Sequence, residues 1–258
     1  MESSMTTGQL IKFSLSKLLY EMFGTFVMTM LFITARETGG SGVLLAGLWI
    51  MTIFCWKISG SHFNPAISIA YIFRKDRGGL PAKLAVFYML AQCLGAFLGA
   101  LMMNYLSFNL TEMSYSDNHW ARAIVQESLG SFIVVFFFMT QTEEKMFFSK
   151  EKAINCFIIA ASYVAARAMF FGSTATPSVY GACLNPAMAL GITFAALINN
   201  GWSVFRNIWI YPVMPFIGSL AALLFYEFVF KKTQEILDHS HNDDVHDENN
   251  EDALLEGH

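Results

Sequence analysis

Charged residues are scarce in this sequence. Asp, Glu, Lys and Arg make up 14% of the 258 residues, while hydrophobic residues make up 55%. Soluble domains usually carry about a quarter charged residues, so this composition excludes an ordinary soluble domain. The chain also lacks a basic stripe and any nucleic-acid motif, which excludes a nucleic-acid partner. Nine of the 20 acidic residues follow Lys232, and the 11 that precede it are outnumbered by the 16 Lys and Arg.

Catalytic and metal-binding motifs are also missing. There is no HExxH motif, no nucleophile elbow and no pair of carboxylates placed for one active site, so we expect no enzymatic activity and no cofactor. The four cysteines lie in apolar surroundings without a C-x-x-C spacing, and we interpret them as reduced packing residues. Three histidines stand among the C-terminal acids: His239, His241 and His246. A solvated, disordered tail explains them better than metal binding does, and no metal site is predicted.

Long apolar runs dominate what the sequence does contain. A helix that spans the hydrocarbon layer of about 30 Å needs about 20 residues. Six segments qualify, at 16–35, 43–58, 83–106, 121–141, 152–171 and 205–230. Two further apolar pieces, 64–73 and 185–197, are too short, because nine residues of helix reach only about 13 Å. We therefore predict an all-α membrane protein with six transmembrane helices and two surface helices or re-entrant half-helices.

Lysine and arginine in the short loops set the expected orientation. They precede the first helix, follow the first short piece, separate the fourth and fifth helices and follow the sixth, whereas 107–119 has neither. Because positively charged loops stay in the cytoplasm, both termini are expected there. A glycosylation sequon begins at Asn109, on the opposite side. Arg36 and Arg206 are exceptions, since this orientation puts them outside.

The two halves of the chain repeat each other. Glu21 in the first helix and Glu127 in the fourth both begin an E-x-x-G-[S/T]-F motif. An Asn-Pro-Ala triplet opens each short piece, at 64–66 and again at 185–187. Since each half has three crossings, the second half is expected to be inverted relative to the first. Such inverted repeats place the functional site near the middle of the membrane.

Each triplet suits the start of a helix that faces its counterpart. Asn is a favoured N-cap residue, because its side-chain oxygen accepts a backbone N–H. Pro fits the first helical turn, and Ala is small enough for the two turns to touch. The positive ends of the two half-helices would meet at mid-membrane and oppose cations, while each Asn NH₂ donates into a pore. Two ordinary helix caps are the alternative, but two copies in register with a second motif argue against it.

Together these motifs resemble the aquaporin, or major intrinsic protein, family over about residues 15–230. The stretches that carry the resemblance are 59–66 (S-G-S-H-F-N-P-A), 91–96, 181–187 and 215–218. The resemblance implies six helices with two half-helices, a homotetramer with one pore per subunit, and no cofactor or catalysis. It also implies that Asn64 and Asn185 are the central pore donors. Glu21 and Glu127 then brace the re-entrant loops through backbone hydrogen bonds, and His62 belongs to the first pore loop.

The sequence departs from the family at the narrow outer filter. The family usually has Arg directly after the second triplet, where this chain has Met188. The other filter positions fall near Leu44 and Ala168, and Ala182 is expected to face the pore. An apolar filter either admits bulkier neutral solutes or loses water and conducts poorly. Arg167 either supplies a substitute guanidinium or has a structural role, and the sequence leaves both open.

These observations predict a passive channel for water and small neutral solutes such as glycerol. The alternative is a structural or adhesive membrane protein that keeps the fold but conducts weakly. The channel would lie in the plasma membrane or an organelle membrane. Three parts are expected: a cytoplasmic N-terminal segment at 1–15, a channel domain at 16–230 with halves at about 16–106 and 121–230, and an acidic, disordered cytoplasmic tail at 231–258.

Overall fold

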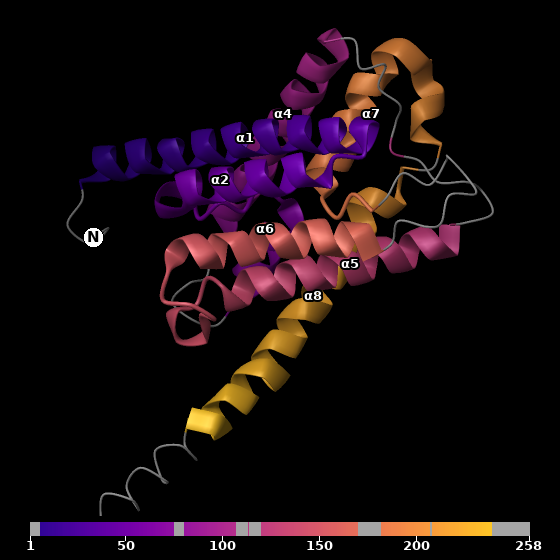
Figure 1. The fold of residues 1–258 in the computed structure, drawn as a ribbon. Coiled ribbons are helices and arrows are strands. Elements are labelled where there is room, and N and C mark those ends of the chain that lie inside the picture. Colours follow the sequence, from indigo (N-terminus) through magenta and orange to yellow (C-terminus); the bar gives the residue numbers. More distant parts are fainter. Residues whose placement is uncertain are drawn as a thin grey trace, which may run out of the picture. The chain divides into compact units, whose positions relative to one another are not determined.

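The regular structure of the described residues is entirely helical (Figure 1). The computed structural model describes residues 6–74, 80–106, 113, 120–169, 182–206 and 208–238, so the sequon at Asn109 and most of the acidic tail lie outside it. The helices are α1 (Thr7–Thr38), α2 (Ser41–Ser59), α3 (Pro65–Phe73), α4 (Ala82–Tyr105), α5 (Trp120–Thr140), α6 (Lys152–Met169), α7 (Pro186–Asn200) and α8 (Ile210–Phe225). Short 3-10 turns, η2 (Glu144–Met146) and η3 (Gly201–Phe205), connect some of them.

Helix α1 begins earlier than the sequence suggested. Thr6 is its N-cap and forms a capping box with Gln9, in which each side chain accepts a hydrogen bond from the other's backbone N–H. The expected N-terminal segment 1–15 is therefore helical from Thr7 onward and continuous with the first crossing, and its place in the cytoplasm stays a prediction. With 32 residues, α1 is about 48 Å long and exceeds the hydrocarbon layer.

Seven helices among the described residues are long and apolar enough to cross a membrane. Six of them are the predicted crossings. The seventh, Pro186–Phe205, is the second predicted half-helix, α7, counted together with η3. Its first residues are fully buried, so α7 begins inside the protein as the half-helix interpretation requires. The outward faces of the long helices carry large exposed apolar side chains, such as Ile50, Phe54 and Leu90, which suit contact with lipid.

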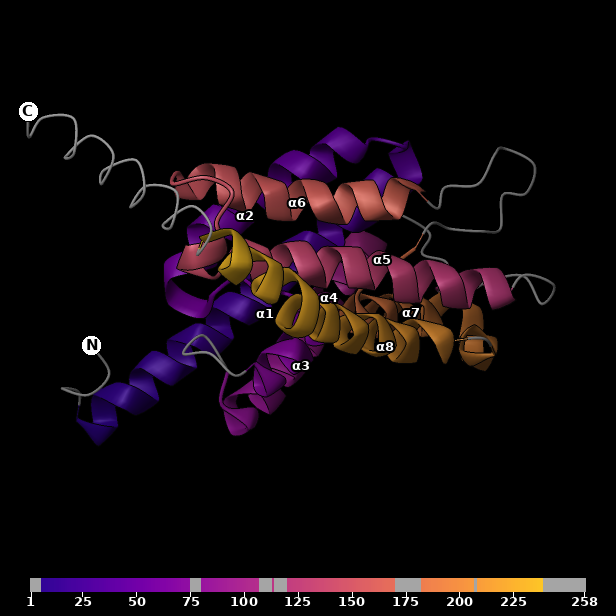
Figure 2. The same ribbon diagram turned by 90° about the horizontal axis from the view of Figure 1, so that it is seen from below.

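The two halves use matching helix pairs. In the first half, α1 packs against α2 and α4. In the second, α5 packs against α6, and the two run side by side in both ribbon views (Figures 1 and 2). Helix α2 also contacts α6, and α7 contacts α4, so elements of the second half lie against elements of the first. The short helix α3 contacts α4, α5 and α7, which places its start among long helices.

Equivalent glycines bring equivalent helices into backbone contact. A Cβ atom on Gly95 of α4 would lie 2.1 Å from the carbonyl oxygen of Met22 in α1. A Cβ atom on Gly218 of α8 would lie 2.0 Å from the carbonyl oxygen of Ser128 in α5. Met22 and Ser128 each directly follow the glutamate of the repeated motif. The small residues of the sequence pattern therefore set the distance between the helices that flank each loop.

The chain divides into two compact units, Met1–Leu223 and Leu224–His258. In the second unit the end of α8 passes into a π-helical turn, η4 (Tyr226–Phe230), and residues 231–238 continue as helix. An ion pair of 3.6 Å between Lys231 and Glu227, one turn apart, supports this continuation. The prediction that disorder begins at residue 231 is therefore wrong for 231–238.

Replacing Gly95 or Gly218 with Ala should destabilise the folded protein. The added methyl group meets backbone atoms that cannot rotate away, so we expect a loss of at least about 1–3 kcal/mol, seen as a lower melting temperature in detergent. Gly42→Ala is the matched control, because a Cβ there meets no atom within 4 Å. Unchanged melting of both variants would show that the helices separate without cost.

Candidate functional site

The two asparagines of the triplets cap the two half-helices. Asn64 accepts a hydrogen bond at Oδ1 from the backbone N–H of Ala66, at 2.9 Å. Asn185 does the same for Ala187 at 3.1 Å and Met188 at 3.3 Å. The proline of each triplet occupies the first turn of its helix, where a missing N–H has no cost. Because the oxygen of each amide is committed to its own helix, the NH₂ group points away from that helix.

Each NH₂ group reaches the opposite loop. Asn64 Nδ2 donates to the carbonyl oxygen of Leu184 at 2.8 Å, and Asn185 Nδ2 donates to the carbonyl oxygen of Phe63 at 2.8 Å. The two bonds are reciprocal, so they join the two half-helix starts face to face. One of the two N–H groups of each amide is used in this way. The Asn185 Nδ2 atom also lies 3.9 Å from Met28 Sδ, and Asn64 lines a small internal cavity.

The glutamates of the repeated motif hold the loops that precede the triplets. Glu21 accepts the backbone N–H groups of His62 and Phe63 at 3.0 and 2.7 Å. Glu127 accepts those of Cys183 and Leu184 at 2.6 and 2.8 Å. All four bonds are buried, where a charge-assisted hydrogen bond is strongest. The structure thus brings both glutamates to the loops that the sequence assigned to them.

These loops adopt an unfavourable backbone conformation. Phe63 has a φ of 49° and Leu184 a φ of 57°, in the left-handed region that residues with a Cβ seldom occupy. The two residues are equivalent in the repeat, since each directly precedes an asparagine. The side chains of Phe63 and Leu184 lie against Gly24 and Gly130, where a Cβ would approach to 1.9 and 2.4 Å. The glycine of the E-x-x-G motif therefore makes room for the strained residue that the glutamate holds.

The first loop has polar support that the second lacks in its matching positions. Gln92 donates from Nε2 to Glu21 at 2.7 Å and to the hydroxyl of Ser68 at 3.0 Å. The same hydroxyl lies 3.1 Å from Nδ1 of His62. In the second half, proline and alanine take the places of Gln92 and Ser68, at Pro215 and Ala189. His62 is thus fixed both through its backbone and through its ring.

Among the residues expected at the outer filter, Ala168 differs from the rest. Leu44, Ala182 and Met188 are buried, with at most 2% of their surface exposed, and Arg167 is also 2% exposed. Ala168, one residue further along α6, is exposed. The inward face of α6 therefore presents Arg167 in place of Ala168. The Arg167 guanidinium lies over the ring of Phe32 at 4.8 Å from its centroid, in a cation–π contact between α6 and α1.

Sequence analysis assigned no role to a second buried arginine, Arg36, which lies in the last turn of α1. The Arg36 side chain is largely buried, with Nη1 at 3.5 Å from Met113 Sδ and Nε at 3.5 Å from Glu37. The sequence marked Arg36 only as an exception to the charge bias. One signal in the sequence was available. Arg36 directly follows the predicted crossing 16–35, and a charged residue at a membrane-spanning segment is costly to bury and usually functional.

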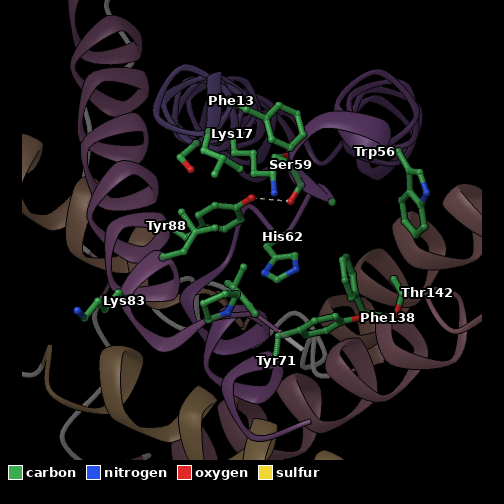
Figure 3. A pocket seen from close by; sticks show the side chains of 16 residues that line it. Phe13, Lys17, Trp56, Ser59, His62, Tyr71, Lys83, Tyr88, Phe138 and Thr142 are labelled. Carbon is green, nitrogen blue, oxygen red and sulfur yellow. Dashed lines mark hydrogen bonds between the residues drawn. The ribbon is translucent and has the colours of Figure 1, made fainter. Parts of the chain in front are cut away.

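Two cavities lie near the first loop. The larger, which we call the vestibule, has a volume of about 640 Å³ (Figure 3). It is lined by the first residues of α1 and α4 and by the last residues of α2, α3 and α5. The smaller, which we call the lumen, has about 20 Å³ and reaches Asn64, Thr52 and Tyr163. A volume of this size holds about one water molecule. His62 lines both cavities.

Metal-binding clusters do not occur in the part of the chain that the structure describes. No group of three or more His, Cys, Asp or Glu side chains gathers there. Cys55, Cys93, Cys156 and Cys183 are all free thiols. The three tail histidines lie outside the described residues. The described site is made of two asparagine amides, two loop-holding glutamates, His62, backbone groups, apolar side chains and buried arginines.

Replacing Glu127 with Gln should loosen the second loop. The amide nitrogen of Gln would face a backbone N–H, so one of two hydrogen bonds to the strained loop is lost. We expect a loss of about 2 kcal/mol, the usual worth of a bond to a charged group, measured as a lower melting temperature in detergent. Glu144→Gln, on an exposed turn, is the control. Equal melting of both variants would mean that Glu127 does not hold the loop.

Comparisons with known proteins agree with this geometry. The profile of the family described as Major intrinsic protein matches residues 13–226. The chain is 29% identical over 206 residues to a probable aquaporin, PIP2-8, of Arabidopsis thaliana, covering 75% of this chain and 70% of that one. It is 30% identical over 236 residues to aquaporin NIP3-1 of the same plant, covering 81% of this chain and 66% of that one.

A solved structure shares the fold. The X-ray structure of the aquaglyceroporin from Plasmodium falciparum superposes with a TM-score of 0.67 over 86% of this chain and 99% of that one, at 22% sequence identity. Six crossings, two half-helices and the repeated loops agree with that architecture. This multi-pass membrane protein, with its paired asparagine caps, belongs to the major intrinsic protein family of channels.

Proposed function

We propose that this chain is a passive channel for water and for small neutral solutes such as glycerol. The observation that carries the proposal is the reciprocal pair of hydrogen bonds between the asparagine amides and the opposite loop carbonyls. They set the N-termini of α3 and α7 against each other. The relatives are named aquaporins and the similar structure an aquaglyceroporin, which supports water and glycerol as the solutes.

The chemistry of this pair suits a neutral solute. The positive ends of two half-helices face one point, so a cation that arrives there is repelled. The remaining N–H of Asn64 can donate to the oxygen of a passing water, and Asn185 can exchange its weak 3.9 Å contact with Met28 Sδ for the same bond. A water held by two donors has its own hydrogens directed outward along both halves of the pore, and this orientation interrupts a chain that would conduct protons. Asn64 and Asn185 would act together in this role.

The outer filter of the proposed channel combines apolar side chains with a displaced arginine. Leu44, Ala182 and Met188 would form its apolar wall, since all three are buried. Arg167 would supply the positive charge that Met188 cannot, because it is buried on the inward face of α6. A guanidinium at this end adds a second barrier to cations. Aliphatic neighbours favour the carbon backbone of a polyol over a strict preference for water.

Both termini would lie in the cytoplasm, on the distribution of Lys and Arg in the loops. The membrane would be the plasma membrane or that of an organelle, and the assembly a homotetramer with one pore per subunit. A weakly conducting structural or adhesive protein is not favoured, since the chain belongs to a family of channels and keeps both asparagines.

Osmotic shrinkage of reconstituted vesicles tests the proposal. Vesicles that carry the protein should shrink faster than empty vesicles in an impermeant osmolyte, and should re-swell as glycerol enters. Asn185→Asp replaces the donor with a carboxylate that faces the carbonyl of Phe63, and should lower water permeability by about tenfold or more. Asn199→Asp, exposed at the far end of α7, is the control. Folded tetramers that match empty vesicles for both solutes would refute the channel.

Removal of Arg167 tests its proposed role. Arg167→Leu should keep water permeability but raise proton leak through the vesicle membrane, by about threefold or more, because one barrier to cations is lost. A pH-sensitive dye inside the vesicles measures the leak. Arg122→Leu, exposed on α5, is the matched control. Unchanged leak in Arg167→Leu would assign that arginine a structural role against Phe32.

A further inference from the structure

The vestibule and the lumen meet at two side chains. Of the residues that line each cavity, His62 and Phe138 are common to both. The cavity volume falls from about 640 Å³ in the vestibule to about 20 Å³ in the lumen. A solute that moves between the vestibule and Asn64 must therefore pass these two rings. We call this passage, formed by His62 and Phe138, the neck.

Aromatic contacts close the neck. The ring centroids of His62 and Phe138 are 5.5 Å apart, with the rings nearly perpendicular at 85°. Tyr71 touches both, at 4.6 Å from His62 and 5.8 Å from Phe138, and Tyr88 lies 5.6 Å from His62 on another side. Figure 3 shows His62 with these three rings around it. Edge-to-face pairs at these distances attract each other, so the closed arrangement is favourable.

The two residues of the neck, His62 and Phe138, are held in place by different contacts. His62 is bonded through its backbone to Glu21 and through its ring to Ser68. Phe138 has no polar atom, so packing alone holds its ring. It is 1% exposed and touches Trp56 in addition to the rings of the neck, with 6.5 Å between the centroids. The width of the neck therefore depends on the size and rotamer of residue 138.

The end of α5 that carries Phe138 is fastened to α3. Thr142, one turn after Phe138, has its hydroxyl hydrogen-bonded to Tyr71, and it accepts a bond from Arg74 Nη1 at 3.1 Å. Arg74 also forms an ion pair of 3.1 Å with Glu143, and its guanidinium covers the ring of Tyr71 at 4.6 Å. These contacts fix the turn beside the neck. A change at Phe138 should consequently alter the passage without moving the backbone around it.

We propose that the neck is a second solute-selecting constriction and that Phe138 is its size-determining residue. The inference rests on the proposed function, since it concerns the same pore. It places discrimination between water and bulkier neutral solutes at the vestibule side of the asparagine pair, in addition to the apolar outer filter. The outer residues Leu44, Ala182 and Met188 then need not set the size limit for neutral solutes, because the neck slows glycerol and slows larger polyols more.

Proteoliposomes with Phe138 replaced test the proposal. Stopped-flow light scattering would measure water, urea, glycerol and erythritol permeability for the wild type, Phe138→Ala and Phe138→Leu. Loss of the ring should raise glycerol and erythritol permeability by about five- to tenfold and water permeability by less, because the larger solutes meet the steeper barrier. Phe138→Leu should lie between. Phe136→Ala is the matched control, since Phe136 is the neighbouring half-exposed phenylalanine on α5.

The outcomes separate this inference from the proposed function. If the wild type conducts water and both Phe138 variants match it for every solute, the neck does not select and the inference is overturned alone. If the wild type and all variants stay at the level of empty vesicles, the channel function fails and the neck with it. A silent wild type with a conducting Phe138→Ala would support the neck as the barrier. Should Phe138→Ala not assemble, Phe138→Leu carries the comparison.

Discussion

Two buried carboxylates, each bonded to two consecutive backbone N–H groups, are the contacts on which the rest of the site depends. Phe63 and Leu184 sit in left-handed backbone conformations that cost of order 1–3 kcal/mol each. Glu21 and Glu127 offset that cost, and in this conformation the asparagines that follow face each other. The reciprocal amide bonds, the starts of the two half-helices and the position of His62 all follow from the held loops.

The two halves of the inverted repeat match in their backbone contacts but differ in the side chains around the two loops. The glutamates, the glycines and the asparagine caps correspond one to one. The support around them does not, since Gln92 and Ser68 have Pro215 and Ala189 as their counterparts. Polar and aromatic side chains thus surround the first loop. The second loop is held instead by Tyr163, whose hydroxyl donates a hydrogen bond to the carbonyl of Cys183 at 2.7 Å. A symmetric backbone carries two chemically different pore halves.

Local patterns in the sequence predicted the repeated parts of the site well. Helix caps act over a few residues, so the two triplets could be recognised as helix starts, whereas the role of both glutamates came from the family resemblance, because their bonds span 41 to 57 positions. Contacts between distant residues were not visible. The ring of Phe138 meets His62 and Tyr71 across segments far apart in the chain, and nothing near residue 138 marks it. The same applies to Ala168 and Arg167, because an offset of one residue decides which of them faces inward. The start of α1 depended on Thr6 and Gln9, which a hydropathy count overlooks.

The reciprocal asparagine bonds also constrain how the protein is made. They join residues separated by 120 and 122 positions in the chain. At a synthesis rate of about 5–20 residues per second, the second loop follows the first by roughly 6–24 s. During that interval the amide of Asn64 lacks the Leu184 carbonyl to which it donates in the folded protein. The first half of the channel therefore exists for that time without its partner loop, and any delay in translation between the two triplets prolongs the time for which the Asn64 amide is unpaired.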